Sequence, residues 1–321
     1  MAMLSGCLKE DKPFELLPRN ANSTYVKLDC NVEDNHMVFL NLSTGIHTEA
    51  PNSAWHIALD NRPNGHSART NLTHASYQLF STQDTDFNIN PKDFMKEANL
   101  MMDSVANWFG NNIVNTDCGY ESDVYIYHHK PDVLGEGEKL FKFQILSADH
   151  KKYRIKYHNL LNINCKEVIL VVEKNPKYNF TYVNFEENEA VYLEPRKEDW
   201  DIVFTQYRDM VIYEVDNTFY PYQVLGALIN PYKTYVYEMN NKKAFVNVNS
   251  EDCKYANWGR VTNTVGFDWK SYSINNAVYE TDSSMIWLLK DQQEDFYKFR
   301  FINFYNDLGE SGYPTLEYAK F

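Results

Sequence analysis

Short runs of alternating apolar and polar residues, separated by polar turns, recur along most of this 321-residue chain. Successive side chains of a β-strand point to opposite faces, so this alternation is typical of strands with one buried face. The pattern predicts a mainly β fold built from antiparallel sheets. The clearest runs are 38–42, 55–59, 124–127, 153–157, 200–204 and 299–302.

Three anchor segments recur in the same order in the two halves of the chain. The matched pairs are 55–59 with 200–204, 120–123 with 279–282, and 140–146 with 296–302. Recurrence in order and at similar spacing indicates an internal repeat. The sequence therefore predicts two related antiparallel β-rich domains in tandem, 24–160 and 165–321, behind an N-terminal segment 1–23.

One segment departs from the strand pattern. Between Asn90 and Gly110, apolar residues recur at helical spacing. Asn90 is a suitable cap, Pro91 suits a first turn, and Gly110 suits a helix end. We expect one amphipathic helix, about 91–109, packed on a sheet of the first domain.

Leu4-Ser5-Gly6-Cys7 has the form of a bacterial lipobox, in which the cysteine becomes lipidated. The alternative is a chance match. Residues 1–23 then comprise the lipobox remnant and a flexible tether, since 8–21 is charged and proline-containing with little periodicity. Acyl chains on Cys7 would anchor the protein. Lys9-Glu10-Asp11 also resembles the signal that sends some bacterial lipoproteins to the outer face of the outer membrane, so we expect an outer-membrane lipoprotein that faces the cell surface.

The net charge of −13 argues against nucleic acid as a partner. The 24 tyrosines suit strands with one wet face, or ligand grooves. Four cysteines remain besides Cys7, and they allow three disulfide connectivities. Their wide spacing gives no framework signature. They are Cys30, Cys118, Cys165 and Cys253.

Several motifs carry a family resemblance. Trp200-Asp201-Ile202-Val203-Phe204-Thr205 and Gly266-Phe267-Asp268-Trp269-Lys270-Ser271-Tyr272 resemble two conserved segments of the HmuY-like lipoproteins of the Bacteroidetes. The strands at 297–301 and 304–318 resemble the C-terminal strands of that family, and 41–45 resembles its motif before the first Trp strand. Both halves of the chain are covered in outline.

This resemblance implies a β-rich surface lipoprotein that captures haem and passes it to a TonB-dependent receptor. It also implies two axial ligands on the haem iron, usually histidines and in some relatives methionine. One ligand of the family follows the Trp-Asp strand. The matching positions here hold Asp60-Asn61 in the first unit and Thr205-Gln206 in the second.

Haem ligation in other positions needs imidazole or thioether donors beside an apolar slot. His128 and His129, at the end of an apolar strand, are the best candidates, with His56, His150 or His158 as partners. All nine histidines lie at or before His158, so Met210 is the candidate donor of the second unit. The alternatives are a surface or strand-end histidine and a methionine in the core.

No motif of a common enzyme class occurs, which favours a protein that is not an enzyme. Three functions stay open. The first is capture of haem or another porphyrin. The second is an accessory subunit that contacts an outer-membrane transport or assembly complex and binds no haem. The third, less favoured, is glycan binding by exposed aromatic residues.

Overall fold

The computed structural model describes residues 22–30, 35–110, 112–131, 137–162, 164–213, 218–239 and 243–321. The lipobox and the lipid anchor predicted at Cys7 lie outside these residues. The described chain is built from β-strands and short 3₁₀ helices, so the prediction of a mainly β fold is confirmed. The helices are η1 Asn52–Ala54, η2 Pro91–Asp93, η3 Glu97–Asn99, η4 Phe245–Asn247 and η5 Asp252–Tyr255.

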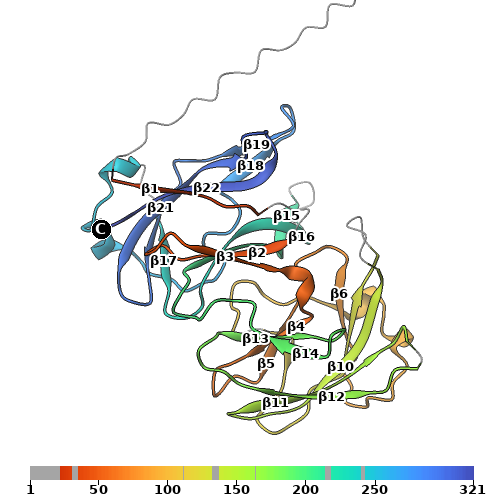
Figure 1. Ribbon diagram of the computed structural model, residues 1–321. Helices are drawn as coiled ribbons and strands as arrows, with labels where there is room; N and C mark the ends of the chain where they lie inside the picture. Colours follow the sequence, from red (N-terminus) through yellow and green to blue (C-terminus); the bar gives the residue numbers. More distant parts are fainter. Residues whose placement is uncertain are drawn as a thin grey trace, which may run out of the picture.

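Two sheets form a first lobe, the lower one in Figure 1. One has the order β14 (Glu189–Val191), β13 (Phe180–Asn184), β4 (Ile57–Asp60), β5 (Ser67–Thr70), β8 (Val114–Asn115). The other has the order β12 (Val168–Glu173), β11 (Lys152–Asn159), β10 (Lys139–Ala148), β9 (Tyr125–His129), β6 (Tyr77–Ser81), β7 (Leu100–Met101). All these pairings are antiparallel.

Two further sheets form a second lobe. One has the order β1 (Thr24–Lys27), β22 (Ser311–Lys320), β21 (Phe296–Tyr305), β20 (Trp287–Lys290), β17 (Tyr235–Glu238). The other has the order β16 (Thr218–Ile229), β15 (Ile202–Tyr213), β2 (His36–Leu40), β3 (His47–Pro51). A separate hairpin, β18 (Lys270–Ser273) with β19 (Val278–Thr281), lies above them in Figure 1.

Strand pairing crosses the division expected at 160–165. The early strands β1 and β2 pair with β22 and β15 of the second half. Conversely, β12 and β13 pair with β11 and β4 of the first half. Figure 1 shows the red and orange β1–β3 among the blue and teal strands. The tandem division at 24–160 and 165–321 stays a prediction. In that division, the first strands of each unit would pair with strands of the other unit.

The apolar core has three main parts. One lies within the second lobe around Trp269, Trp287 and Phe301, and another within the first lobe around Phe143, Ile155 and Phe185. A third joins the lobes, because residues of both lie in it. Its largest side chains include Trp55, Trp108, Phe180 and Trp200.

The two antiparallel meanders β9-β10-β11 and β20-β21-β22 correspond in one detail. Lys142 on β10 donates its ammonium to the carbonyl of Phe87, 2.6 Å away, and lies over that ring. Lys298, at the matching position of β21, donates to the carbonyl of Phe245 at 2.8 Å and lies over that ring in turn. A buried amine needs such acceptors, which come from the segment between β6 and η2 in the first case and from η4 in the second.

The expected helix at 91–109 is wrong. The segment contains η2, η3 and the short strand β7, which pairs with β6. Asn90 does cap η2, through its side chain. The apolar residues serve different cores, because Met101 and Met102 pack in the first lobe whereas Trp108 packs between the lobes. A single helix would have placed these apolar residues on one face, whereas the structure packs them in two different cores.

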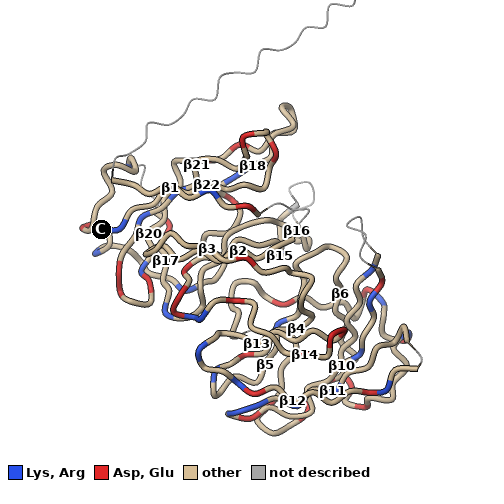
Figure 2. The backbone as a smooth tube through the Cα atoms, in the orientation of Figure 1, with Lys and Arg blue, Asp and Glu red and all other residues tan. Residues whose placement is uncertain are grey.

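Cys30, Cys118, Cys165 and Cys253, the four cysteines within the described ranges, are all free. No described helix is both long and apolar enough to cross a membrane. Figure 2 shows acidic and basic residues interspersed over both lobes, with no segregation of positive from negative charge.

Candidate functional site

A cavity of about 410 Å³ lies in the second lobe between the edge strand β16 and the β18–β19 hairpin. We call it the aromatic pocket. Cavities of this size, mainly apolar with a few polar groups, are typical of small-molecule sites. It is lined by Gln206, Tyr222, Gln223, Val224, Leu225, Phe267, Lys270, Ser271, Tyr272, Tyr279, Phe304 and Ser311.

Two glycines bring the wall segments together. Gly266 and Ala227 exchange backbone hydrogen bonds of 2.9 and 3.0 Å, which fasten the segment before β18 to β16. A Cβ on Gly226 would lie 2.6 Å from the carbonyl oxygen of Gly266, so this approach requires glycine. Gly266 itself has φ +60°, which also favours glycine. The close contact sets where the following side chains enter the pocket.

Trp269 holds the segment 266–272 against the core of the second lobe. Its indole stacks on Phe301 with ring centroids 3.9 Å apart and donates to the carbonyl of Gly266 at 3.1 Å. Trp269 is fully buried. Because Trp269 is held in the core, its neighbours Phe267 and Lys270 line the pocket.

Lys270 is the cationic group of the pocket. Its ammonium donates to the carbonyl of Leu225 at 2.5 Å and lies 4.4 Å from the ring centroid of Trp269. Burial lowers the pKa of Lys270 to about 7, against the opposing effect of Asp268 and Cys30. The amine therefore changes its charge near neutral pH and can act as a weak cation or as a neutral donor.

Tyrosines form the open side of the pocket. Tyr222 on β16 is 63% exposed, and Tyr272 and Tyr279 pack edge to face across the β18–β19 hairpin, with centroids 5.1 Å apart. Tyr279 also packs against Phe304, at 5.1 Å. The arrangement presents flat aromatic faces and phenol oxygens to a ligand. Tyrosinate is also a known axial ligand of haem iron.

The structure places the predicted histidines elsewhere, on β9 in the first lobe. His128 meets Glu138 through Nε2 at 2.8 Å, and His129 is 1% exposed and packs edge to face on Tyr77. As adjacent strand residues they face opposite sides. Of their proposed partners, His56 is buried and accepts from the backbone N–H of Phe185. None of these histidines lines the aromatic pocket.

Met210 lies on β15 and is 43% exposed. It shares a strand face with Gln206, which lines the aromatic pocket, but four residues of strand separate the two by about 13 Å. Gln206, which follows the Trp-Asp motif, therefore reaches the pocket, whereas Met210 lies outside it.

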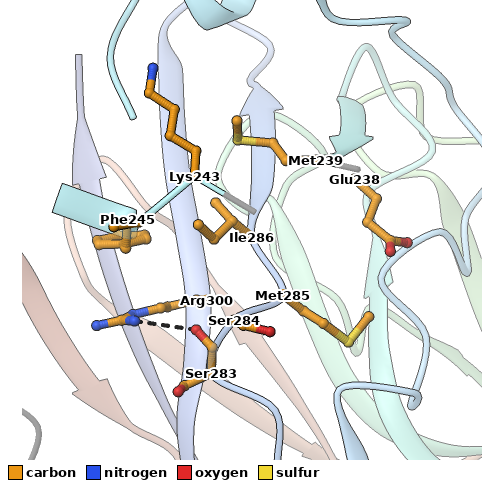
Figure 3. A pocket seen from close by; sticks show the side chains of 10 residues that line it. Glu238, Met239, Lys243, Phe245, Ser283, Ser284, Met285, Ile286 and Arg300 are labelled. Carbon is orange, nitrogen blue, oxygen red and sulfur yellow. Dashed lines mark hydrogen bonds between the residues drawn. The ribbon is translucent and has the colours of Figure 1, made fainter. Parts of the chain in front are cut away.

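A second cavity in this lobe, of about 510 Å³, lies between the end of β17, the segment that leads into η4, the segment before β20, and Arg300 of β21 (Figure 3). Met239 and Met285 line it and offer thioethers. Its cations already have partners, because Arg300 pairs with Glu317 at 2.7 Å and Lys243 with Asp252 at 2.6 Å. Met239 packs in a small apolar cluster with Phe245. We regard this cavity as secondary.

The aromatic pocket was not predicted from the sequence as a site, although its signal was there. Two of the second-half segments that carry the resemblance line the pocket, 266–272 through Phe267 and Lys270 to Tyr272, and 304–318 through Phe304 and Ser311. The segment 200–205 ends one residue before Gln206, and β16 lies between it and 266–272. The convergence of 266–272 and 304–318, rather than any single donor residue, indicates the site. Among the described residues, no cluster of three potential metal ligands occurs.

Comparison with known proteins agrees with the resemblance for part of the chain. Residues 176–318 match the family model described as HmuY protein. No curated protein matches the chain. Similar solved structures include the apo HmuY analog TFO of Tannerella forsythia, at 10% identity and TM-score 0.28 over 92% of this chain and 94% of that one. Another is apo PinO of Porphyromonas gingivitis, at 8% and 0.29 over 94% and 98%.

Proposed function

We propose that the protein is a non-enzymatic surface lipoprotein that binds haem or a related porphyrin in the aromatic pocket. Cys7 would hold it on the outer membrane, and a TonB-dependent receptor would take up the ligand. The observation that carries this proposal is that two HmuY-like segments, 266–272 and 304–318, line one aromatic cavity within the part of the chain that matches the family model.

The pocket supports binding by stacking more than by paired axial ligands. Phe267 and the three tyrosines offer flat faces to a macrocycle, and Lys270 offers a cation to a propionate. Neither histidine nor methionine lines this pocket, so the iron donor available there is a tyrosine phenol. Stacking alone would bind a metal-free porphyrin as well.

The test is a titration of the purified chain with haemin, followed at the Soret band, and a parallel titration with metal-free protoporphyrin, followed by fluorescence. We expect saturation near one equivalent with haemin. Tyr222→Ala and Tyr272→Ala should each weaken binding about tenfold, which corresponds to loss of about 1.4 kcal/mol of stacking. Tyr255→Ala, at an 84% exposed residue of η5, is the matched control.

Variants of the sequence-predicted donors separate the sites. His128→Ala with His129→Ala, and Met210→Ala, should leave the haemin titration unchanged. Loss of the Soret shift in the histidine variant would move the site to β9. Tyr279→Phe keeps the ring and removes the oxygen, so weaker binding of haemin but not of protoporphyrin would identify Tyr279 as the iron ligand.

A specific observation favours the second candidate function, an accessory subunit that contacts an outer-membrane complex. The far half of the β15–β16 hairpin exposes large apolar residues, among them Ile212, Phe219 and Tyr220. Exposed apolar patches mark interaction sites. A featureless titration with both porphyrins would reject porphyrin binding and leave this interaction role.

A further inference from the structure

A smaller cavity, of about 190 Å³, lies at the boundary of the two lobes, away from the aromatic pocket. We call it the junction pocket. Loops from both lobes build it, a common location for ligand sites. It is lined by Asn61, Arg62, Pro63, Phe109, Pro176, Tyr178, Asn179, Lys197, Pro231, Tyr232 and Arg260.

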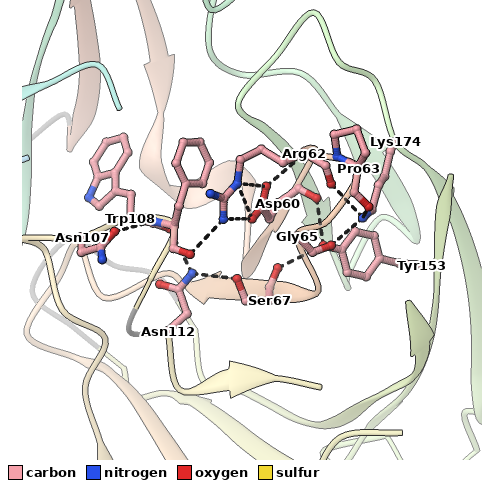
Figure 4. Close-up of polar contacts among 11 residues, drawn as sticks. Asp60, Arg62, Pro63, Gly65, Ser67, Asn107, Trp108, Asn112, Tyr153 and Lys174 are labelled. Atoms are coloured by element: carbon pink, nitrogen blue, oxygen red, sulfur yellow. Dashed lines mark hydrogen bonds and ion pairs between the residues drawn. The ribbon is translucent and has the colours of Figure 1, made fainter. Parts of the chain in front are cut away.

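Three cations and no acidic side chain line this pocket, in a chain whose net charge is −13. Arg62 is held in place by Asp60, with Nη2 2.7 Å from the carboxylate and 2.9 Å from the carbonyl of Phe109 (Figure 4). Asp60 is fully buried behind it. The guanidinium is thus preorganised, and about half of its side chain stays exposed.

The other two cations lack a carboxylate partner. Within the described chain, no acidic group lies within ion-pair distance of Lys197 or Arg260. Lys197 lies 4.2 Å from the ring centroid of Tyr232, and Arg260 donates to the carbonyl of Pro231 at 2.7 Å. Both are held at the pocket wall by neutral groups, so their charge remains available to a ligand.

Asn61 adds an unsatisfied donor to the wall. It is 2% exposed, and its Oδ1 accepts from the backbone N–H of Asn175 and the hydroxyl of Thr181. These two donors fix the amide orientation. The Nδ2 of Asn61 is then buried without an acceptor among the described residues. A buried donor without a partner is costly, and a ligand oxygen would satisfy it.

The remaining wall is flat and apolar. Phe109, Tyr178 and Tyr232 supply rings, and three prolines fill the space between them. Tyr178 is steadied by stacking on Tyr192, with centroids 4.2 Å apart. Liquid water takes about 30 Å³ per molecule, so the cavity holds about six waters or one monosaccharide-sized ring. It is too small for a porphyrin.

We propose that the junction pocket binds a six-membered ring carrying one oxyanion, the chemistry of a sugar acid or a sugar phosphate. The oxyanion would lie between Lys197 and Arg260, a ring hydroxyl would accept from Asn61 Nδ2, and the ring would pack on the tyrosine and proline wall. This site is independent of the porphyrin proposal, because it shares no residue with the aromatic pocket.

Isothermal titration of the full chain with glucuronate and with glucose 6-phosphate tests the proposal and separates the two sources of the anion. Glucose and inorganic phosphate are the comparison ligands. We expect at least one charged sugar to bind about tenfold more tightly than both comparison ligands. Lys197→Gln and Arg260→Gln should each weaken that binding about tenfold, the effect of losing one charged hydrogen bond.

Arg154→Gln, at an exposed arginine of β11, is the matched control and should leave binding unchanged. Asn61→Asp keeps the acceptor that Asn175 and Thr181 need and replaces the free donor by a carboxylate, so it should abolish binding. The proposal is overturned if neither charged sugar binds, if inorganic phosphate binds as tightly as both, or if binding is unchanged in Lys197→Gln and Arg260→Gln.

Discussion

Lys270 shows how one buried amine couples the aromatic pocket to pH. Its pKa falls from the usual 10.5 to about 7 on folding, because burial disfavours the charged form. Between these values the unfolded chain binds more protons than the folded one at this residue. Stability should therefore rise with pH in this window. Below about pH 7 the folded chain keeps Lys270 charged and carries the full free-energy cost of burying that charge.

Lys270→Met removes this titration and so isolates it. The free energy of unfolding of the native chain, minus that of the variant, should rise by about 2 kcal/mol from pH 7 to pH 9, since one pKa unit is about 1.4 kcal/mol. Urea denaturation at each pH measures it. The exposed Lys254 supplies the control variant Lys254→Met. A difference that stays flat over this range would show that Lys270 keeps an ordinary pKa.

Residue types alone did not reveal the aromatic pocket. Histidine and methionine were reasonable haem donors by chemistry, but His128 is engaged with Glu138 and Met210 lies beyond the cavity. The pocket combines Gln206 from β15 with Lys270 and Tyr279, which come from distant segments of the chain. Sequence motifs marked two of these segments. Their meeting depends on the contact of Gly226 with Gly266, which no local pattern encodes.

At the scale of elements, the segment that failed to form a helix is organised by one buried carboxylate. Asp103 accepts from the backbone N–H of Thr70 at 2.6 Å, from the Thr70 hydroxyl at 2.8 Å and from the backbone N–H of Ile113 at 2.7 Å. These bonds tie the segment to β5 and to the loop before β8. In a helix its backbone donors and acceptors would have been satisfied within the segment instead.

Asp103→Ala should lower the free energy of unfolding by about 3 kcal/mol, because three donors in the interior lose their acceptor. Urea denaturation followed by tryptophan fluorescence measures the change. Asp93→Ala, at an exposed aspartate of η2, should change stability by less than about 0.5 kcal/mol. Equal effects of the two substitutions would show that Asp103 does not hold this segment.

The strands themselves were predictable because alternation is a local property. The runs at 38–42, 55–59, 124–127, 153–157, 200–204 and 299–302 overlap β2, β4, β9, β11, β15 and β21. Which strand pairs with which depends on distant partners. β2 is buried on both faces, because Val38 and Leu40 pack in the second-lobe core while Met37 and Phe39 pack in the core that joins the lobes. Its pairing with β15, more than 160 residues away, leaves no mark in the sequence of β2.

At the scale of the whole molecule, the strand pairings describe one lobe inserted into another. Residues 57–191 contain every strand of the two sheets of the first lobe. The second lobe combines β1–β3 with the strands from β15 onward. The core around Trp55, Phe180 and Trp200 then joins the two lobes. A fragment should therefore fold on its own only if it contains all the strands of one lobe.

Fragment 52–199 should therefore fold on its own, whereas fragment 24–160, the first domain expected from the sequence, should not. A cut at 160 removes β12, β13 and β14, so that β11 and β4 each lose one of their two neighbouring strands. Unpaired edges and an incomplete core favour aggregation over folding. Near-ultraviolet circular dichroism and calorimetry should show a cooperative transition for 52–199, below that of the full chain because the joint core is exposed. A cooperative transition for 24–160 and none for 52–199 would establish the tandem division instead.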